Sequence, residues 1–224
     1  MSAKLNAKFK AAIFDLDGML SESLESIAHT VNLVLTEKGH KEIELERFKV
    51  LVGDGARTLI ERVLKLKGIE DAGTVEEYFA RYLELFEEGC LYNLRACDGV
   101  EALVHDLKAG GFKLAVLSNK PDLMTNKCVK AIFGEGVFDR IVGVKEGLKK
   151  KPDPAGALAL AEEFGVRPEE CIYLGDTNTD MQTGKAAGMF TIGVLWGFRD
   201  EAELRENKAD AIIHRPEEVL GLLR

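Results

Sequence analysis

The sequence has few of the features that mark secreted, membrane-spanning or nucleic-acid-binding proteins. It has four cysteines in 224 residues and no Cys-x-x-Cys pair, so we expect neither a disulfide framework nor a structural zinc site. No run of 18 apolar residues occurs, and Met1–Lys10 lacks the apolar segment of a signal peptide. The net charge of −8 disfavours nucleic-acid and anionic-membrane surfaces. We therefore expect a cytoplasmic globular protein with neither partner.

A short apolar run near the N-terminus leads directly into two acidic residues. Residues 11–14 have strand character, and Asp15, Asp17 and Gly18 follow at once. In open α/β sheets, ligands bind in the crevice beyond the carboxyl ends of the strands. Two neighbouring carboxylates repel each other there unless a cation neutralises them, and a hard cation with oxygen ligands such as Mg²⁺ suits them.

The spacing of apolar residues changes twice along the rest of the chain. Between residues 21 and 92 the apolar residues have helical spacing, with no strand signal. This segment contains 15 acidic and 9 basic residues. From residue 97 onwards, helices alternate with strands, which is typical of a parallel sheet with helices on both faces. We therefore predict an α/β fold: a doubly wound, Rossmann-like core (1–20 and 93–224) with an inserted all-helical cap (21–92). The strand before Asp15 should lie near the centre of the sheet. The remaining strands are expected at 112–117, 138–144, 171–174, 189–195 and 210–213.

Polar side chains follow several of these predicted strands. Ser118 and Asn119 follow one strand, Asp176 and Asp180 follow another, and Lys151 stands before a proline and a helix start. Acids, a lysine and small hydrogen-bonding side chains in one crevice would form a site for Mg²⁺ and a phosphoryl group.

Each candidate also has a plainer interpretation. Asp15 and Asp17 alone could form a turn, because Asp-Gly is a common turn dipeptide. Asp176 could cap a helix. Arg57 follows a glycine-rich turn and could present a cation to an anionic substrate, but an exposed helix arginine is an equally good interpretation.

Four segments together resemble the haloacid dehalogenase-like hydrolases: FDLDG (14–18), LSNK (117–120), KKPDP (150–154) and YLGDTNTD (173–180). Their order and spacing match the family over nearly the whole chain. Within it, the sequence is most similar to phosphoglycolate phosphatases with a helical cap.

The resemblance implies a role for each matching residue. Asp15 is the nucleophile that forms an aspartyl-phosphate, and Asp17 is the general acid and base. Lys151 keeps Asp15 ionised and offsets phosphoryl charge. Phosphoryl oxygens are held by Ser118, Asn119 and Gly18. Mg²⁺ is held by Asp15, the backbone carbonyl of Asp17, Asp176 and, at one remove, Asp180.

The same resemblance predicts a Mg²⁺-dependent phosphomonoester hydrolase, with 2-phosphoglycolate as the preferred candidate substrate. The acidic cap leaves pyrophosphate, sugar phosphates and nucleotide monophosphates as alternatives, and the sequence does not choose between a monomer and a homodimer. A phosphomutase of this family is a further alternative, but its cap histidine would fall at Ile27, and His29 is offset by two positions. A non-catalytic phosphate-binding module would not need the four intact charged motifs. Met19 and Glu22 depart from the usual family residues, so we expect altered rate or preference and not inactivity.

Overall fold

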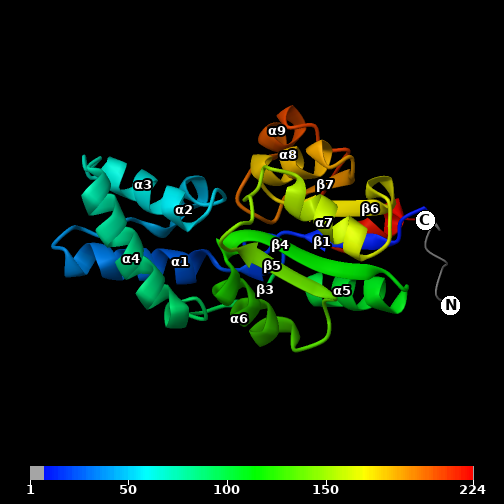
Figure 1. Cartoon of the computed structure of the whole chain (residues 1–224), viewed down its shortest axis with the longest axis horizontal. Coiled ribbons are helices and arrows are strands. Elements are labelled where there is room, and N and C mark those ends of the chain that lie inside the picture. The colour runs from blue at the N-terminus through cyan, green and yellow to red at the C-terminus, as the bar shows by residue number, and fades with distance from the viewer. Residues whose placement is uncertain (1–7, 224) are drawn as a thin grey trace.

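A computed structural model describes residues 8–223, and its centre is a six-stranded, wholly parallel sheet. The strand order is β5-β4-β1-β6-β7-β8 (Figure 1). This confirms the predicted doubly wound fold. The strands are β1 (Ala11–Phe14), β4 (Lys113–Pro121), β5 (Arg140–Val144), β6 (Cys171–Gly175), β7 (Phe190–Val194) and β8 (Ala211–Ile213).

Strand β1 lies inside the sheet, as predicted. Its four residues are fully buried, and it pairs with β4 on one side and β6 on the other. A strand covered on both faces needs apolar side chains at every position, which explains the unbroken apolar run. Its carboxyl end therefore opens between two neighbouring strand ends that also carry polar residues.

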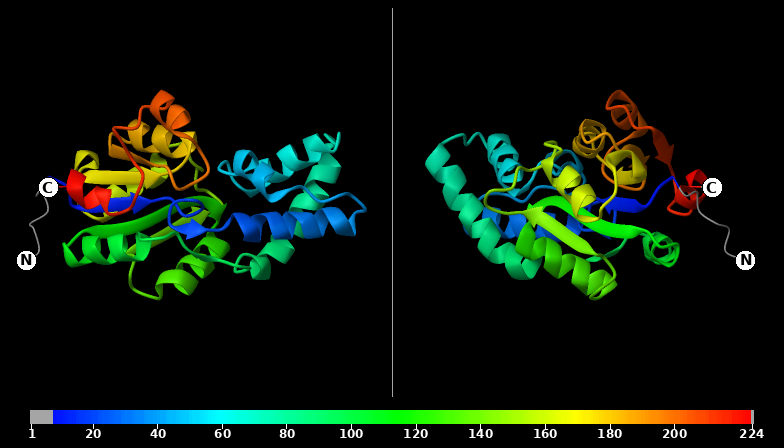
Figure 2. Two further views of the ribbon diagram at one scale, coloured as in Figure 1. Left: turned by 180° about the vertical axis from the view of Figure 1, so that it is seen from behind. Right: turned by 45° about the vertical axis from the view of Figure 1, so that its right-hand side comes forward.

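Helices cover both faces of the sheet (Figures 1 and 2). Side chains of the strands and helices form two apolar clusters. Ala12 and Phe14 point into the cluster that includes α5 and α6, while Ala11 and Ile13 point into the cluster that includes α7. The core helices are α5 (Val100–Ala109), α6 (Asp122–Phe133), α7 (Ala155–Glu163), η1 (Pro168–Glu170), α8 (Asn178–Ala186), α9 (Glu201–Glu206) and α10 (Glu218–Leu222).

Four further helices lie beyond one end of the sheet (Figure 1). They are α1 (Leu24–Glu37), α2 (Leu45–Leu51), α3 (Ala56–Leu66) and α4 (Ala72–Gly89). Two short strands, β2 (Ser21–Glu22) and β3 (Arg95–Ala96), pair antiparallel where the chain leaves and re-enters the core. The expectation of no strand between residues 21 and 92 was therefore wrong at Ser21–Glu22, because a two-residue strand is too short to leave a periodic pattern. The exact domain boundaries remain a prediction.

Other differences concern element ends. Strand β4 continues to Pro121, past the predicted end at 117, and the short elements α9 and η1 were not predicted. Within residues 8–223, no helix is long and apolar enough to cross a membrane. The first seven residues of the predicted core, and most of the Met1–Lys10 segment judged not to be a signal peptide, lie outside the described residues.

Candidate active site

Asp15 is fixed at the carboxyl end of β1. Its backbone N–H donates to the carbonyl of Leu174 on β6 (2.9 Å), and the residue is only 7% exposed. Burial and the nearby Asp180 carboxylate raise the pKa of Asp15 to about 7, although Lys151 opposes the shift. The carboxylate therefore needs a cation beside it to stay ionised.

Lys151 supplies one such cation. Its Nζ lies 2.7 Å from Asp15 Oδ1 and 2.7 Å from Asp180 Oδ1, and the side chain is 3% exposed. Burial alone would lower the pKa of this ammonium, but the two carboxylates raise it well above its ordinary value. Lys151 thus bridges Asp15, at the end of β1, and Asp180, in the first turn of α8.

Asp180 serves two partners at once. Its Oδ2 accepts hydrogen bonds from the backbone N–H (3.1 Å) and hydroxyl (2.7 Å) of Thr177. The first of these bonds, together with the Asp180 N–H that donates to Thr177 Oγ1 (3.4 Å), forms a capping box at the start of α8. Its other oxygen contacts Lys151. Both oxygens are therefore engaged by the protein itself, which fits the predicted position at one remove from a metal.

Asp176 has one engaged oxygen and one free oxygen. Its Oδ2 accepts from the backbone N–H of Phe198 (2.7 Å), whereas Oδ1 is buried without a hydrogen-bond partner. Burial and the neighbouring Asp180 and Asp15 carboxylates raise the pKa of Asp176 well above its ordinary value. A buried carboxylate oxygen without a donor is costly unless another group, such as a metal ion, binds it.

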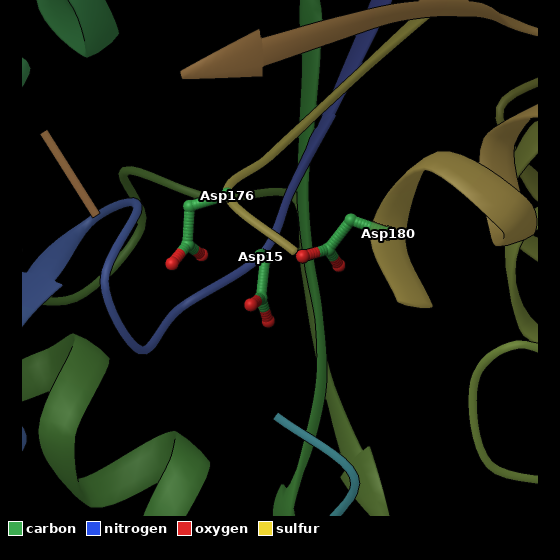
Figure 3. Close-up of side chains that lie close together, drawn as sticks. All are labelled: Asp15, Asp176 and Asp180. Atoms are coloured by element: carbon green, nitrogen blue, oxygen red, sulfur yellow. The ribbon is translucent and has the colours of Figure 1, made fainter. Parts of the chain in front are cut away.

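These three carboxylates form a cluster that could hold a metal (Figure 3). One oxygen each of Asp15, Asp176 and Asp180 lie within 4.8 Å of one another, and all three residues are buried. An all-oxygen donor set suits a hard divalent cation. The single ammonium of Lys151 leaves net negative charge in the cluster. The carboxylate of Asp17 is not part of the cluster, because it pairs with Lys120.

Ser118 and Asn119 lie beside this cluster, on β4. Ser118 Oγ accepts from the backbone N–H of Lys120 (3.2 Å) and lines the pocket above Asp15. The Asn119 side chain accepts from the Lys151 backbone N–H (2.9 Å) and donates to the Lys151 carbonyl (3.1 Å). Asn119 therefore fixes the backbone of Lys151, and this contact was not anticipated beside its predicted phosphate-binding role.

Gly18 packs closely against Asp176. A Cβ at Gly18 would lie 2.5 Å from Asp176 Oδ2, and the residue adopts a φ of +88°, which favours glycine. Its N–H donates to the carbonyl of Ser21 (2.9 Å). The structure thus uses Gly18 for close approach in the turn and gives its N–H a protein partner, instead of leaving that N–H free for phosphate.

The helices beyond the sheet cover the site and leave a small pocket of about 50 Å³. The core contributes Asp15, Asp17, Ser118, Asn119 and Lys120 to its lining. The helical segment contributes mainly apolar side chains, namely Ile27, Val52, Ala56, Leu59, Tyr82 and Phe86.

Arg57 is not among the residues that line this pocket. Its guanidinium pairs with Glu61 (3.2 Å) and Glu76 (2.5 Å) and lies over the ring of Phe79. The side chain is about half exposed, at 48%. The exposed helix arginine is therefore the interpretation that this geometry favours.

The two departures from the family pattern do not touch the carboxylate cluster. Met19 is fully buried, and its carbonyl accepts a hydrogen bond from Trp196 Nε1 (3.0 Å). Glu22 forms an ion pair with Arg95 across the β2–β3 pair. Met19 lies within the turn after Asp17, and Glu22 lies in β2 just beyond it.

Sequence reasoning missed two residues that the structure places at the site. Thr177 fixes Asp180 through the capping box, which its spacing from Asp180 could have indicated. Lys120 is buried and paired with Asp17. Lys120 was not expected to be buried in the sheet, because the predicted strand ended three residues earlier, at residue 117.

Comparison with known proteins agrees with this geometry. A family model described as haloacid dehalogenase-like hydrolase matches residues 12–194. The chain is 33% identical to a phosphoglycolate phosphatase of Aquifex aeolicus, with 96% of each protein covered. It is 32% identical to a phosphoglycolate phosphatase of Nitrosospira multiformis, with 91% of each covered.

A crystal structure of a predicted phosphoglycolate phosphatase from Haemophilus somnus superposes with a TM-score of 0.89 at 26% identity, covering 97% of this chain and 99% of that one. The match of the family model extends from β1 to the end of β7 and so includes every strand end that carries a site carboxylate. The chain therefore belongs to the haloacid dehalogenase-like hydrolases.

Proposed function

We propose that this protein is a Mg²⁺-dependent phosphomonoester hydrolase that works through an aspartyl-phosphate on Asp15. The observation that carries the proposal is the buried group of Asp15, Lys151, Asp176 and Asp180 at the carboxyl edge of the sheet. It combines a carboxylate nucleophile, a fixed cation and a donor set for a metal in one buried cluster. Phosphoryl transfer through an aspartyl-phosphate uses all three components.

The donor set fits Mg²⁺. Asp15 and Asp176 would hold the ion through carboxylate oxygens, and the unpartnered Asp176 Oδ1 is the donor that most needs it. Asp180 and the backbone carbonyl of Asp17 would be the remaining protein groups around the ion. When bound, Mg²⁺ would neutralise negative charge on the phosphoryl oxygens.

The protein's own groups divide the reaction into two steps. Asp15 attacks phosphorus, so that an Asp15 O–P bond forms and the ester P–O bond breaks, while Asp17 gives a proton to the leaving oxygen. Asp17 then takes a proton from water as the water oxygen attacks phosphorus and releases Asp15. Lys151 stabilises charge on Asp15 and the phosphoryl group in both steps.

The substrate we favour is 2-phosphoglycolate. Two relatives of similar length, at 32% and 33% identity, have that activity in their names. The pocket of about 50 Å³ has room for only a few water molecules, which favours a small leaving group over a sugar or nucleoside. Pyrophosphate would be equally small, so it must be tested directly.

The phosphomutase alternative has less support. Ile27 lines the pocket at the position where a mutase would carry a histidine. His29 instead stacks on Tyr92, with ring centroids 4.1 Å apart. In the described chain, no histidine is among the residues that line the pocket, so the cap histidine expected of a phosphomutase is lacking there.

We further propose that residues 21–92 act as a cap that opens for substrate and closes for chemistry. The loop between α2 and α3 meets the core at several points. Asn119 and Lys150 donate to the carbonyls of Gly53 and Asp54 (3.3 and 3.0 Å), and Thr179 donates to Asp54 Oδ1 (2.8 Å). These polar contacts are compatible with a reversible interface.

The test is release of inorganic phosphate from a panel of monoesters and pyrophosphate, with Mg²⁺ and with EDTA. We expect hydrolysis of phosphoglycolate that requires Mg²⁺ and is lost in Asp15→Asn. Asp106→Asn on α5 is the matched control, since Asp106 is 54% exposed and far from the site in the fold. Turnover in EDTA, or activity that survives Asp15→Asn, would refute the mechanism. A uniform rate across the panel would refute the substrate assignment alone.

A further inference from the structure

Lys120 is a buried cation that the proposed steps do not use. It lies near the end of β4, its side chain is 2% exposed, and its Nζ forms an ion pair with Asp17 Oδ1. From the helical segment, the ring of Phe86 on α4 approaches to 5.1 Å between Nζ and the ring centroid. Burying an ammonium is costly, so a lysine kept here needs a compensating role.

The Lys120 ammonium has more donors than its hydrogen-bond partners use. An ammonium carries three N–H donors. Among residues 8–223, Asp17 Oδ1 is the one hydrogen-bond acceptor that Lys120 Nζ reaches, and the Phe86 ring is its other described contact. A second hydrogen-bond acceptor would therefore find a free N–H in a group that water barely reaches.

The pocket beside Lys120 is otherwise poor in positive charge. Of the residues that line it in the described chain, Lys120 is the one cation, and most of the opposite wall is apolar. Lys151 faces Asp15 and Asp180, on the phosphoryl side. Arg57 is paired outside the pocket. A second negative group on a substrate would therefore have Lys120 as its counter-charge, and the apolar surroundings would strengthen that attraction.

The position of Asp17 fixes where that second group would lie. Asp17 is the residue expected to protonate the ester oxygen, and Lys120 contacts Asp17 directly. A carboxylate two bonds from the ester oxygen, as in a phosphorylated 2-hydroxy acid, would fall next to Lys120. One ammonium can serve two carboxylates, since Lys151 contacts both Asp15 and Asp180 in this structure.

We propose that Lys120 is a specificity-determining residue that binds the carboxylate of the leaving group, selecting phosphomonoesters of short 2-hydroxy acids. This inference rests on the proposed phosphatase function. It goes further by naming the chemical feature that the pocket recognises and the residue that recognises it. The competing explanation is that Lys120 only positions Asp17.

The two explanations differ in a ratio of rates. We would measure kcat/KM for phosphoglycolate and for its amide, 2-amino-2-oxoethyl phosphate, which has the same size without the charge. A charge-assisted hydrogen bond predicts a preference of about ten- to a hundredfold for phosphoglycolate in the wild type. In Lys120→Met the ratio should fall to within about threefold, and Lys120→Arg should retain part of the preference. A residue that only positions Asp17 would slow both esters equally and leave the ratio unchanged.

The control variant is Lys130→Met on α6, where the lysine is about half exposed and pairs with Glu135. It should keep the wild-type ratio. Thermal melting shows whether the Lys120 variants fold. A second test uses the wild type alone. In 3-(phosphonooxy)propanoate the carboxylate lies one carbon further from the ester oxygen, so the ratio of kcat/KM for this ester to that for its amide should be smaller than the ratio for phosphoglycolate.

Three results would overturn the inference: no wild-type preference for phosphoglycolate over its amide, a preference that survives Lys120→Met, or a preference unaffected by moving the carboxylate. Hydrolysis of both esters at similar rates, dependent on Mg²⁺ and Asp15, would refute the role of Lys120 while leaving the phosphatase function intact. Failure to hydrolyse any monoester would overturn both.

Discussion

Replacing Asp176 with asparagine should stabilise the metal-free protein and remove its response to Mg²⁺. The carboxylates of Asp15, Asp176 and Asp180 have oxygens within 4.8 Å of one another. At an effective dielectric constant of about 20, two unit charges at that separation repel by about 3.5 kcal/mol. Lys151 is the one ammonium that contacts the cluster in the described chain, and it offsets part of this repulsion.

The substituted side chain can keep the useful contact. Its amide oxygen can accept from the Phe198 N–H, as Asp176 Oδ2 does at 2.7 Å, and its NH₂ would then face the remaining carboxylates. We expect a net gain of about 2 kcal/mol, or about 4–8 °C in the melting midpoint for a protein of this size. The raised pKa of Asp176 also predicts that the substitution stabilises the protein. A carboxyl group whose pKa is higher in the folded state than in the unfolded state destabilises the native state at neutral pH.

The assay is thermal melting of both proteins in EDTA and in saturating Mg²⁺. Mg²⁺ should raise the wild-type midpoint, because a ligand that binds only the native state adds about 2.7 kcal/mol at a hundred times its Kd. Asp176→Asn should start higher in EDTA and gain little from Mg²⁺, and Asp106→Asn should match the wild type in both. A variant that melts lower than the wild type in EDTA, or that keeps the full Mg²⁺ response, would show that this cluster is not the metal site.

Two further predictions concern the cap and the opposite end of the sheet. The Arg199 guanidinium donates to the carbonyls of Lys49 and Val52 (2.8 Å to Val52), so Arg199→Ala should weaken closure and raise KM about tenfold. An unchanged KM, equal to that of the exposed control Arg205→Ala, would contradict this. Contacts with Lys10, the Arg167 backbone and the Arg167 side chain lower the pKa of Glu170 to about 2, so its stabilisation is present above about pH 4.5 and is lost toward pH 2. The gap in melting midpoint between wild type and Glu170→Gln should therefore shrink as pH falls, and a constant gap would contradict the prediction.

The sequence predicted the acidic part of the site well because strand ends carry it. Parallel strands bring their carboxyl ends to one edge, so Asp15 and Asp176 had to approach once the sheet was assigned. Lys151 and Asp180 were candidates because they stand next to a predicted helix start and a predicted strand end, and the resemblance implied their roles. In the structure, Lys151 Nζ lies 2.7 Å from Asp180 Oδ1.

Side-chain partnerships across separate elements could not be read in the same way. Arg57 was considered for the substrate because a flexible turn precedes it, but its partner Glu76 lies on a different helix, α4. Lys120 looked like a residue after a strand, whereas β4 continues through it and buries it beside Asp17. Such pairings depend on how separate elements pack against one another within the cap and within the core, and no local pattern encodes that packing.

Asp180 has two roles that link the first turn of α8 to the chemistry of Asp15 at the end of β1. Because the same carboxylate closes the first turn of α8 and steadies Lys151, unwinding of that turn would disturb the ammonium and, through it, Asp15. Thr177 contacts Asp180 and has no described hydrogen bond with Asp15. A substitution of Thr177 would nevertheless slow the reaction, because it would disturb Asp180. The first turn of α8 therefore helps to hold Lys151, and through it Asp15, in position.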